Sequence, residues 1–463
     1  MPKPRIRGML DIKTLKQKVR SGEIETVISA FPDMYGRLMG KRFAAKFFID
    51  NVLREGLHAC DYLLASDMEM TPVPGYEFTS WEKGYGDVRL RPDLATLRVA
   101  SWLDRTALVV CDVLDEKRNE PVALAPRTVL KKQLELARRN GFSVKGASEL
   151  EFFLFRDSYE HAARKQYLDL QTAGNYIEDY HILQGTKEEE VIGAIRGHLE
   201  RSGIPVENSK GEWGPGQQEI DIQYGDLLET ADRHVVYKQA AKEIAWQKGQ
   251  SVTFMAKWNS AMAGSSMHIH ASLWDKKGSQ PLFAGKEKVS GIHCSKYFLW
   301  FLGGWIAHMR ELFPFYAPYP TSYKRYVAGS FAPTALAWGN DNRTAGFRVV
   351  GNGRSLRIEC RTPGADANPY LSFAATVAAG LDGIRKRIEP PPVFEGDIYK
   401  ARELPQVPKT LREAIAEMEK SSWVRNTFGD NVVDHYLHFF RTEQQKFDEV
   451  VTTWELARYF ERS

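Results

Sequence analysis

At 463 residues, the chain is too long for one small hydrophobic core, so we expect two domains. With 43% hydrophobic and 26% charged residues, it has the composition of an ordinary soluble globular protein. Its net charge of +4 is not gathered into any basic tract, which argues against nucleic acid as a partner.

We expect neither a disulfide framework nor a membrane partner. The four cysteines lie far apart without CxxC spacing, which is typical of free thiols in a reducing compartment. The N-terminus lacks the apolar run of a signal peptide. The most apolar stretch, residues 297–309, is shorter than the roughly 18 residues of a membrane span and predicts a buried helix. The predicted location is therefore cytoplasmic.

Short helices and strands alternate over the first part of the chain. Apolar spacing predicts helices at residues 11–21 and 44–56, and strands at residues 26–31 and 106–112. Residues 71–93 are rich in proline, glycine and aromatic residues and predict a long ordered loop, a kind of segment that often has a function. A charged turn at 115–120 precedes a helix expected from Pro126 to about Asn140, so we place the domain boundary at residue 120.

The clearest strand pattern is SELEFFLF, from Ser148 to Phe155. Glu149 and Glu151 share one face of this strand, and apolar residues fill the other. Two carboxylates at this spacing repel each other and are costly to bury unless a cation neutralises them. The pair predicts either a metal site or a solvent-exposed edge strand.

A glycine-proline-glycine turn divides the next acidic segment, residues 206–224. Glu212 and Glu219 flank the turn, which can bring their carboxylates together, and Glu219 begins a second alternating strand. Divalent cations such as Mg²⁺ prefer carboxylate oxygens. The pair therefore predicts further metal ligands, and the alternative is a solvated acidic loop.

Residues 264–273, GSSMHIHASL, alternate in the same way. His268, His270 and Ser272 face one side, and apolar residues face the other. A lone histidine on a strand is more often a satisfied core residue than a ligand. Two histidines in register beside acidic strands favour contact with a metal or a phosphate.

Arginines are concentrated between residues 323 and 371. The six members of this group are Arg325, Arg343, Arg348, Arg354, Arg357 and Arg361. The run SLRIECR at 355–361 predicts a strand with Arg357, Glu359 and Arg361 on one face. That face is either a solvated edge strand with ion pairs or a site for a polyanion and a metal, because arginine matches the geometry of phosphate and carboxylate.

Together these strands offer several potential ligands for divalent cations. They are Glu149, Glu151, Glu212, Glu219, His268 and Glu359. This set suffices for two or more ions, and the arginines remain for phosphates. Nucleotide-dependent phosphoryl transfer needs this combination. Because the sequence contains no GxxxxGK[ST] loop, the nucleotide must be held in another way.

The motifs, in their order and spacing, resemble the glutamine synthetase superfamily of the prokaryotic type over essentially the whole chain. The matching segments are ELE at 149–151, GPGQQE ending at Glu219, GSSMHIHASL at 264–273 and NR…RIECR…ANPYL from Asn342 to Leu371. The resemblance implies an α+β fold, with a small β-grasp domain at residues 1–120 and a catalytic domain at residues 121–463. The catalytic domain would contain a curved antiparallel sheet backed by helices. A homo-oligomer, commonly a dodecamer of two stacked hexameric rings with sites between subunits, is also implied.

The resemblance implies metal ligands as well. Those expected near the amino-acid substrate are Glu151, Glu212 and Glu219. Those expected near the nucleotide phosphates are Glu149, His268 and Glu359. The expected cofactor is Mg²⁺ or Mn²⁺, with two or three ions per site.

Substrate contacts follow from the same resemblance. The residues expected near ATP are Glu207, His270, Ser272, Arg343, Arg348 and Arg357. Those expected at glutamate are Glu151, Gly264, Arg325 and Arg361, and the catalytic arginines are Arg325, Arg343 and Arg361. The implied reaction has two steps. The γ-carboxylate of glutamate attacks the γ-phosphorus of ATP, and a nitrogen nucleophile then displaces phosphate from γ-glutamyl phosphate. Metals and arginines stabilise the charge on the transferred phosphoryl group.

Two departures from the family pattern concern the nitrogen nucleophile. Phe331 stands six residues after Arg325, where glutamine synthetases carry a glutamate that binds and deprotonates ammonium. A phenyl ring cannot accept a proton but can pack against carbon. The aromatic segment 71–87 replaces a segment that supplies another ammonium-binding acid. We therefore expect Phe331 to line an amine pocket, as in the branch that makes γ-glutamyl amides, with a small alkyl or aryl monoamine as substrate.

Two alternatives remain open at this point. Glu77, Glu82 or Asp87 would compensate for the missing glutamate in an ordinary glutamine synthetase that uses ammonia. A non-catalytic structural relative would have lost metal ligands, and every one of them is present here. Magnesium-dependent ATP turnover distinguishes an enzyme from such a relative.

Overall fold

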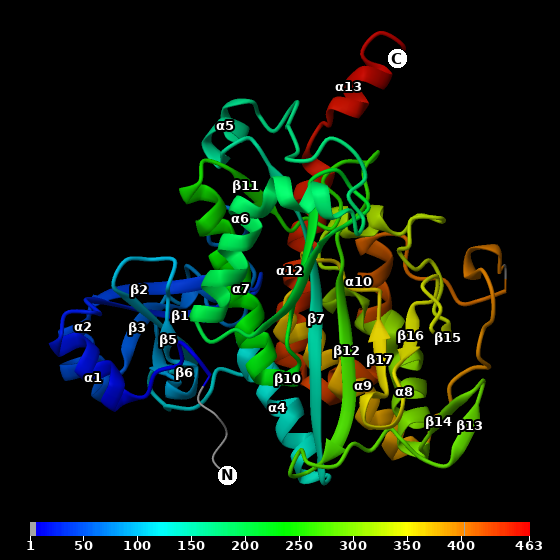
Figure 1. The fold of residues 1–463 in the computed structure, drawn as a ribbon, viewed down its shortest axis with the longest axis horizontal. Helices are drawn as coiled ribbons and strands as arrows, with labels where there is room; N and C mark the ends of the chain where they lie inside the picture. The colour runs from blue at the N-terminus through cyan, green and yellow to red at the C-terminus, as the bar shows by residue number, and fades with distance from the viewer. Residues whose placement is uncertain (1–5, 402) are drawn as a thin grey trace.

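Two β-sheets organise the chain in the computed structural model, which describes residues 6–401 and 403–463. In Figure 1 the first sheet, in blue and light blue, lies to one side of the larger second sheet. In the described residues, the larger of two clusters of buried apolar residues extends from Leu10 to Phe440 and so includes residues of both parts. The α+β class expected from the sequence is confirmed.

The first sheet contains six strands in the order β2–β1–β6–β4–β3, with β5 paired to β6. Their bounds are β1 (Thr26–Pro32), β2 (Leu38–Ala44), β3 (Leu57–Cys60), β4 (Asp87–Pro92), β5 (Arg98–Val99) and β6 (Thr106–Asp115). The central pair β1–β6 is parallel and the other pairs are antiparallel, which agrees with a β-grasp. The helical segments of this part are α1 (Ile12–Arg20), α2 (Ala45–Phe47), η1 (Phe48–Val52), α3 (Leu53–Glu55), η2 (Asp61–Leu64) and η3 (Leu94–Thr96).

The predicted loop at residues 71–93 is wrong at its C-terminal end, where β4 forms. Val88 and Leu90 are buried and alternate with two arginines, and the strand pairs with both β3 and β6. Only two apolar residues mark this strand, so its sequence pattern is weak. The predicted division at residue 120 falls in the turn that follows β6, and it stays a prediction.

The second sheet contains nine strands, in the order β15–β16–β17–β12–β7–β9–β8, with β10 and β11 paired to β7. Their bounds are β7 (Phe142–Phe155), β8 (Val206–Gly211), β9 (Gln217–Ile222), β10 (Gly225–Asp226), β11 (Ser251–Thr253), β12 (Met267–Asp275), β15 (Trp338–Asn340), β16 (Phe347–Val350) and β17 (Arg357–Cys360). All pairs are antiparallel except β15–β16. A separate hairpin joins β13 (Glu287–Val289) to β14 (Ile292–Cys294).

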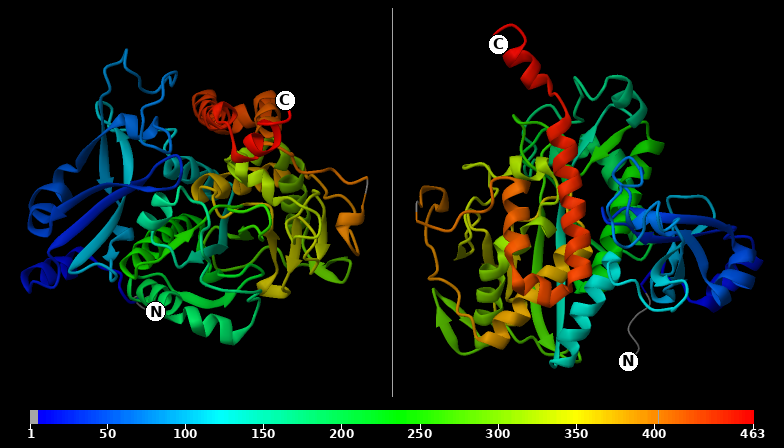
Figure 2. Two further views of the ribbon diagram at one scale, coloured as in Figure 1. Left: turned by 90° about the horizontal axis from the view of Figure 1, so that it is seen from above. Right: turned by 180° about the vertical axis from the view of Figure 1, so that it is seen from behind.

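Helices cover one face of this second sheet. Figure 1 shows β7 and β12 in front of α4, α9 and α12, and the rear view in Figure 2 shows α12 and α10 in front of the strands. The helices are α4 (Pro126–Arg139), α5 (Tyr159–Arg164), α6 (Ile182–Arg201), α7 (Leu227–Gln247), α8 (Lys296–Leu312), α9 (Pro369–Lys386), α10 (Leu411–Lys420), α11 (Ser422–Phe428), α12 (Asp430–Glu449) and α13 (Thr453–Tyr459). Short helical turns are η4 (Phe313–Phe315), η5 (Pro320–Arg325), η6 (Gly353–Ser355) and η7 (Ile398–Lys400).

The period-two pattern of the central strands explains this layering. Leu150, Phe152 and Leu154 of β7 belong to the buried core, whereas Glu149 and Glu151, which alternate with them, have polar neighbours on adjacent strands. The apolar stretch at 297–309 forms most of α8, which is largely buried, as predicted. None of the helices in the described residues is long and apolar enough to cross a membrane.

Candidate active site

Strand register brings the predicted polar residues together on one face of the second sheet. Glu149 of β7 lies opposite His268 of β12, and His270 lies opposite Glu359 of β17. On the other side of β7, Glu151 lies opposite Glu219 of β9. Because side chains alternate along each strand, these residues point to the same side.

The first acidic cluster contains Glu149, His270 and Glu359, whose potential ligand atoms lie within 4.8 Å of one another. His270 Nε2 lies 2.6 Å from Glu149 Oε1. His268, the histidine that the sequence predicts as a ligand, has its Nδ1 atom 3.1 Å from Glu149 Oε2 and 3.6 Å from Glu359 Oε1. Both histidines therefore border this cluster.

Glu359 is completely buried, and β17 lies between β16 and β12. The alternative of a solvated edge strand is therefore wrong for this segment. Arg348 Nη1 donates to Glu359 Oε2 at 2.7 Å, and Arg361 Nη1 donates to Oε1 at 2.6 Å. Burial alone would raise the pKa of Glu359, but the charges of His270 and Arg361 hold it at about 2. The carboxylate is thus ionised across the physiological pH range.

The second acidic cluster contains Glu151, Glu212 and Glu219, again with ligand atoms within 4.8 Å of one another. Ser266 holds Glu151 from two directions, since its backbone N–H donates to Oε2 at 2.7 Å and its hydroxyl donates to Oε1 at 2.6 Å. Lys210 Nζ donates to Glu212 and lies 3.4 Å from Glu219 Oε1. Sequence reasoning missed Lys210, which lies near the end of β8, and its spacing of two residues from Glu212 was the signal available in the sequence.

Sequence reasoning also missed Asp221, which lies opposite Glu149 in the sheet. Burial and the Glu149 carboxylate raise the pKa of Asp221 to about 6. Burial and Asp221 in turn raise the pKa of Glu219 well above its ordinary range. The period-two run from Glu219 to Ile222 was the signal that could have identified this residue.

The two clusters fit divalent cations. Five carboxylates and two imidazoles supply oxygen and nitrogen donors of the kind that Mg²⁺ and Mn²⁺ accept. Burial and the neighbouring carboxylates raise the pKa of Glu219 even though Lys210 lowers it, so a cation there would relieve the remaining repulsion. Within the described chain, the buried Asp221 Oδ1 atom has no hydrogen-bond partner, which leaves one more acceptor beside the clusters.

A pocket of about 450 Å³ lies next to the first cluster. Four of the residues predicted to contact ATP line it: Glu207, His270, Ser272 and Arg357. Arg357 Nε donates to His270 Nδ1 at 3.1 Å, so the guanidinium is fixed at the junction between pocket and cluster. The pocket therefore joins four of the predicted ATP contacts to the first acidic cluster.

The other two arginines predicted near ATP differ in their surroundings. Arg348 is held between Glu359 and Asp341, with its Nε atom donating to Asp341 Oδ1 at 2.9 Å. Arg343 is exposed in the turn after β15 and, within residues 6–401 and 403–463, forms no hydrogen bond with another predicted site residue. Arg348 therefore belongs to the first acidic cluster, whereas Arg343 forms no hydrogen bond with that cluster in the described residues.

Residues predicted at the glutamate substrate lie together. Arg325 donates to the backbone oxygens of Arg361 at 2.8 Å and Thr362 at 3.1 Å. A Cβ atom on Gly264 would lie 2.5 Å from Arg325 Cγ, so only glycine fits against this arginine without a shift. Arg361 Nε is buried and, among the described residues, has no hydrogen-bond partner, which leaves a donor for an anionic ligand.

Phe331 lies beside Trp213, a residue that sequence reasoning missed. The two rings are 5.9 Å apart between centroids and inclined by 62°. Phe331 has φ +57°, an uncommon conformation for a bulky side chain, and it is 48% exposed. Trp213 follows Glu212 directly, and this adjacency to a predicted ligand was the signal available in the sequence.

The aromatic segment 71–87 packs against α12 of the same chain. Tyr76 is buried against His435 and His438 of α12, with ring centroids 4.6 and 4.4 Å apart. Trp81, by contrast, is 70% exposed. The acids that would compensate for the missing glutamate, Glu77, Glu82 and Asp87, are all exposed.

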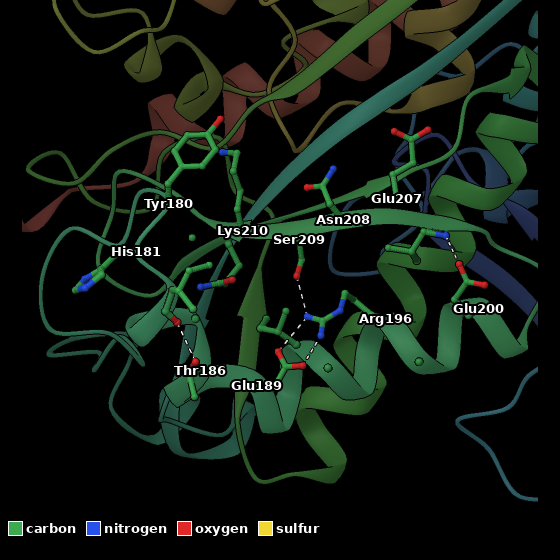
Figure 3. Close-up of a pocket in the computed structure, with 18 residues that line it drawn as sticks. Tyr180, His181, Thr186, Glu189, Arg196, Glu200, Glu207, Asn208, Ser209 and Lys210 are labelled. Carbon is green, nitrogen blue, oxygen red and sulfur yellow. Dashed lines mark hydrogen bonds and ion pairs between the residues drawn. The ribbon is translucent and has the colours of Figure 1, made fainter.

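A larger pocket of about 810 Å³ lies between α6 and β8, outside both acidic clusters. Figure 3 shows Arg196 of α6 paired with Glu189 of the same helix and with Ser209 of β8. The hydrogen bonds from Arg196 Nη1 to Glu189 Oε2 and Ser209 Oγ are 3.0 and 2.8 Å long. Lys210 and Tyr180 point toward each other in the same view, with the ammonium 4.9 Å from the ring centroid. Lys210 therefore links this pocket to the second cluster.

Comparison with known proteins agrees with this geometry. The glutamine synthetase catalytic-domain profile matches residues 123–459. The chain is 48% identical to the γ-glutamylethanolamide synthetase GlnA4 of Streptomyces coelicolor, covering 98% of this chain and 96% of that protein. It is 35% identical to a glutamate–isopropylamine ligase of Pseudomonas sp., covering 97% and 98%. A solved GmaS/ADP complex matches with a TM-score of 0.84 and 27% identity, covering 96% and 99%. The chain therefore belongs to the glutamine synthetase family.

Proposed function

We propose that the protein is an ATP-dependent ligase that joins the γ-carboxylate of glutamate to a small primary amine. The products are a γ-glutamyl amide, ADP and phosphate. The observation that carries the choice of an amine over ammonia is the Phe331 ring packed beside Trp213 at the second acidic cluster. This apolar surface stands where the family pattern has an ammonium-binding glutamate. The names of the ethanolamide and isopropylamine relatives support the same choice.

The proposed site divides between the two substrates. ATP would occupy the pocket lined by Glu207, His270 and Ser272, with Arg357 and Arg348 near its phosphates. Glutamate would bind beside Gly264 and Arg325, next to the second cluster. Mg²⁺ or Mn²⁺, bound at the two clusters, would supply positive charge to the phosphates and to the attacking carboxylate. Arg343 would join the site when ATP is bound, since among the described residues it forms no hydrogen bond with the other candidates.

In the proposed first step, an oxygen of the glutamate γ-carboxylate attacks the γ-phosphorus and ADP leaves. Arg361 offers its free Nε–H to the transferred group, and Glu359 fixes the guanidinium through Nη1. In the second step, the nitrogen of the free amine attacks the γ-carbonyl carbon, phosphate leaves, and the proton lost by the nitrogen passes to the departing phosphate or to solvent. Charged donors that are already in place stabilise the developing negative charge without reorganisation.

A homo-oligomer of two stacked hexameric rings is proposed as the working assembly. Its support is the apolar surface at the C-terminal end, where Val450, Val451, Trp454, Leu456 and Phe460 are exposed.

A cytoplasmic location is proposed from the four cysteines, all of which are free thiols.

The function is tested by incubating the purified protein with glutamate, ATP, Mg²⁺ and ethanolamine. We expect γ-glutamylethanolamide by mass spectrometry, with one phosphate released per amide formed and none when glutamate is omitted. Formation of glutamine from ammonia with no amide from any amine would contradict the proposal and support an ordinary glutamine synthetase. ATP hydrolysis with no dependence on a nitrogen nucleophile would contradict both.

A further inference from the structure

We infer that Trp213 and Phe331 together form the surface that recognises the carbon substituent of the amine, with Trp213 as a specificity-determining residue. The ligand class is a primary monoalkylammonium ion with a short chain. This inference rests on the proposed function and names the residue that sets its amine preference. The two residues come from different elements, the turn between β8 and β9 and the loop after η5.

Trp213 is held in a fixed position relative to the second acidic cluster. The Glu212 backbone N–H donates to the Gln217 carbonyl at 2.8 Å, and the Gly214 N–H donates to Gln217 Oε1 at 2.9 Å. Gln217 Nε2 in turn donates to the Gly264 carbonyl at 2.9 Å. These bonds tie the turn on both sides of Trp213 to residues of the proposed glutamate site.

The backbone on both sides of Phe331 is fixed by hydrogen bonds of its neighbours. Tyr399 donates its hydroxyl to the Ala332 carbonyl at 2.9 Å, and Ser330 donates to the Val327 carbonyl at 2.6 Å. The left-handed backbone of Phe331 is a conformation that bulky residues keep only where their surroundings impose it. Such conformations cluster at functional sites, and this one directs the ring toward Trp213.

The two rings form an open corner that suits an alkylammonium group. They meet at 62°, and each remains about half exposed, with 50% for Trp213 and 48% for Phe331. Inclined aromatic rings bind a cation through their faces and an alkyl chain through apolar contact. Ammonia has no carbon to make the second contact, so the corner favours a substituted amine.

Lys210 limits the charge of the amine that fits. Its ammonium binds Glu212 and lies 3.4 Å from Glu219, and Lys210 stands on β8 three residues before Trp213. A second positive charge on the substrate would therefore meet a like charge beside the aromatic corner. This arrangement favours a monoamine over a polyamine.

The inference is tested with Trp213→Ala, Trp213→Leu and Trp213→Phe, measuring kcat and KM for ethylamine, ethanolamine, putrescine and hydroxylamine. Hydroxylamine is the nucleophile without carbon. We expect Trp213→Ala and Trp213→Leu to raise KM for ethylamine about tenfold, and Trp213→Phe to retain most of the affinity, since only phenylalanine keeps an aromatic face. The ratio of kcat/KM for ethylamine over that for hydroxylamine should fall in proportion. Retention of affinity by Trp213→Leu would overturn aromatic recognition.

A double-mutant cycle separates shared recognition from general damage. Trp213→Ala and Phe331→Ala combined should raise KM for ethylamine less than the product of the single effects, because both remove the same corner. Val327→Ala is the matched control, an exposed apolar residue of the same loop, and it should leave KM unchanged. If the double variant raised KM by the full product of the single effects, the inference would be overturned. An unchanged KM in Trp213→Ala, with a wild type that uses amines, would also overturn the inference but leave the proposed function standing. No use of any amine by the wild type would instead contradict the proposed function.

Discussion

Glu359 joins basic side chains from neighbouring segments of the second sheet. It binds Arg348 of β16 and Arg361 just after β17, and it lies near His268 of β12. Removing one partner of a buried ion pair leaves the other charge uncompensated, which is far more costly than losing an exposed pair. The same carboxylate is a proposed ligand on the phosphate side, so stability and activity should respond together.

Glu359→Ala should abolish ATP turnover and lower the free energy of unfolding. We expect phosphate release to fall about 100-fold or more, as for loss of an essential metal contact, and stability to fall by about 3–5 kcal/mol. Phosphate assays and chemical denaturation measure the two effects. Asp341→Asn is the control, because it removes only the exposed partner of Arg348. If Glu359→Ala kept most of its activity, the metal assignment would be wrong.

Phe331→Glu tests the aromatic replacement directly. A carboxylate beside Trp213 would attract ammonium and accept its proton, and it would lose apolar contact with an alkyl chain. We expect kcat/KM for ethylamine to fall about tenfold and the use of ammonia to rise. Steady-state rates with the two nucleophiles measure the change. An unchanged amine profile would show that this side chain does not line the pocket.

At the scale of strands, period two was enough to predict which side chains share a face. Glu149 with Glu151, and Arg357 with Glu359, lie on the predicted side because alternation is strict in a paired strand. Register between strands is a tertiary property, however, and no local pattern specifies that His270 lies opposite Glu359. The family resemblance placed His268 in the cluster, and the structure shows that His270 lies closer to Glu149 than His268 does.

Contacts between residues that are distant in the chain could not be predicted from the sequence. Trp213 and Phe331 are far apart in the chain and meet only because the turn after β8 approaches the loop after η5. The strand β4 was missed for a related reason, since Val88 and Leu90 gain their burial from β3 and β6 on either side. Tertiary packing overrides a weak local pattern in both cases.

A second buried carboxyl pair supports the turn that carries Trp213. Gln218 Nε2 donates to Glu178 Oε2 at 2.9 Å and to Glu188 Oε2 at 2.8 Å. Glu178 Oε1 also accepts from the Gly216 N–H at 2.6 Å. Burial and the neighbouring Glu178 carboxylate raise the pKa of Glu188 to about 8, so Glu188 holds a proton at neutral pH.

This pair makes stability depend on pH. Glu188 is protonated in the folded state up to about pH 8 but ionised in the unfolded chain above about pH 4.3. The folded state binds more protons in that window, so stability falls as pH rises, by up to about 1.4 kcal/mol per pH unit. Glu188→Gln mimics the protonated form and should flatten the decline between pH 5 and 8 in chemical denaturation. A parallel decline in the variant would contradict the assignment, and Glu190→Gln, an exposed neighbour, is the control.

At the scale of the whole molecule, helices cover one face of the second sheet (Figures 1 and 2). The strand register places the carboxylates together on the other face. The buried core behind this face fixes the strands, so the acidic side chains cannot move apart to relieve their repulsion. The repulsion that raises the pKa of Glu219 is therefore built into the sheet. Cation binding should stabilise the entire fold.

Mg²⁺ or Mn²⁺ should raise the melting temperature of the protein, and EDTA should reverse the effect. At a metal concentration about 100 times the dissociation constant, the gain is about 2.7 kcal/mol. Differential scanning fluorimetry without substrates measures it independently of activity. Glu219→Gln should reduce the metal effect, and Glu190→Gln should leave it intact. A melting temperature that does not respond to either metal would contradict the two proposed metal clusters.

The most direct test of the ligase proposal is the specificity of phosphate release, as kcat/KM for ethanolamine and ethylamine against kcat/KM for ammonia. Because glutamate, ATP and Mg²⁺ are saturating, formation of γ-glutamyl phosphate is the same in every assay. Differences in kcat/KM therefore report the preference for one nitrogen nucleophile over another. We predict a preference of at least about 100-fold for one of the amines, because ammonia gains nothing from the corner formed by Trp213 and Phe331. Ammonia reacting faster than every amine would contradict the proposal and identify an ordinary glutamine synthetase.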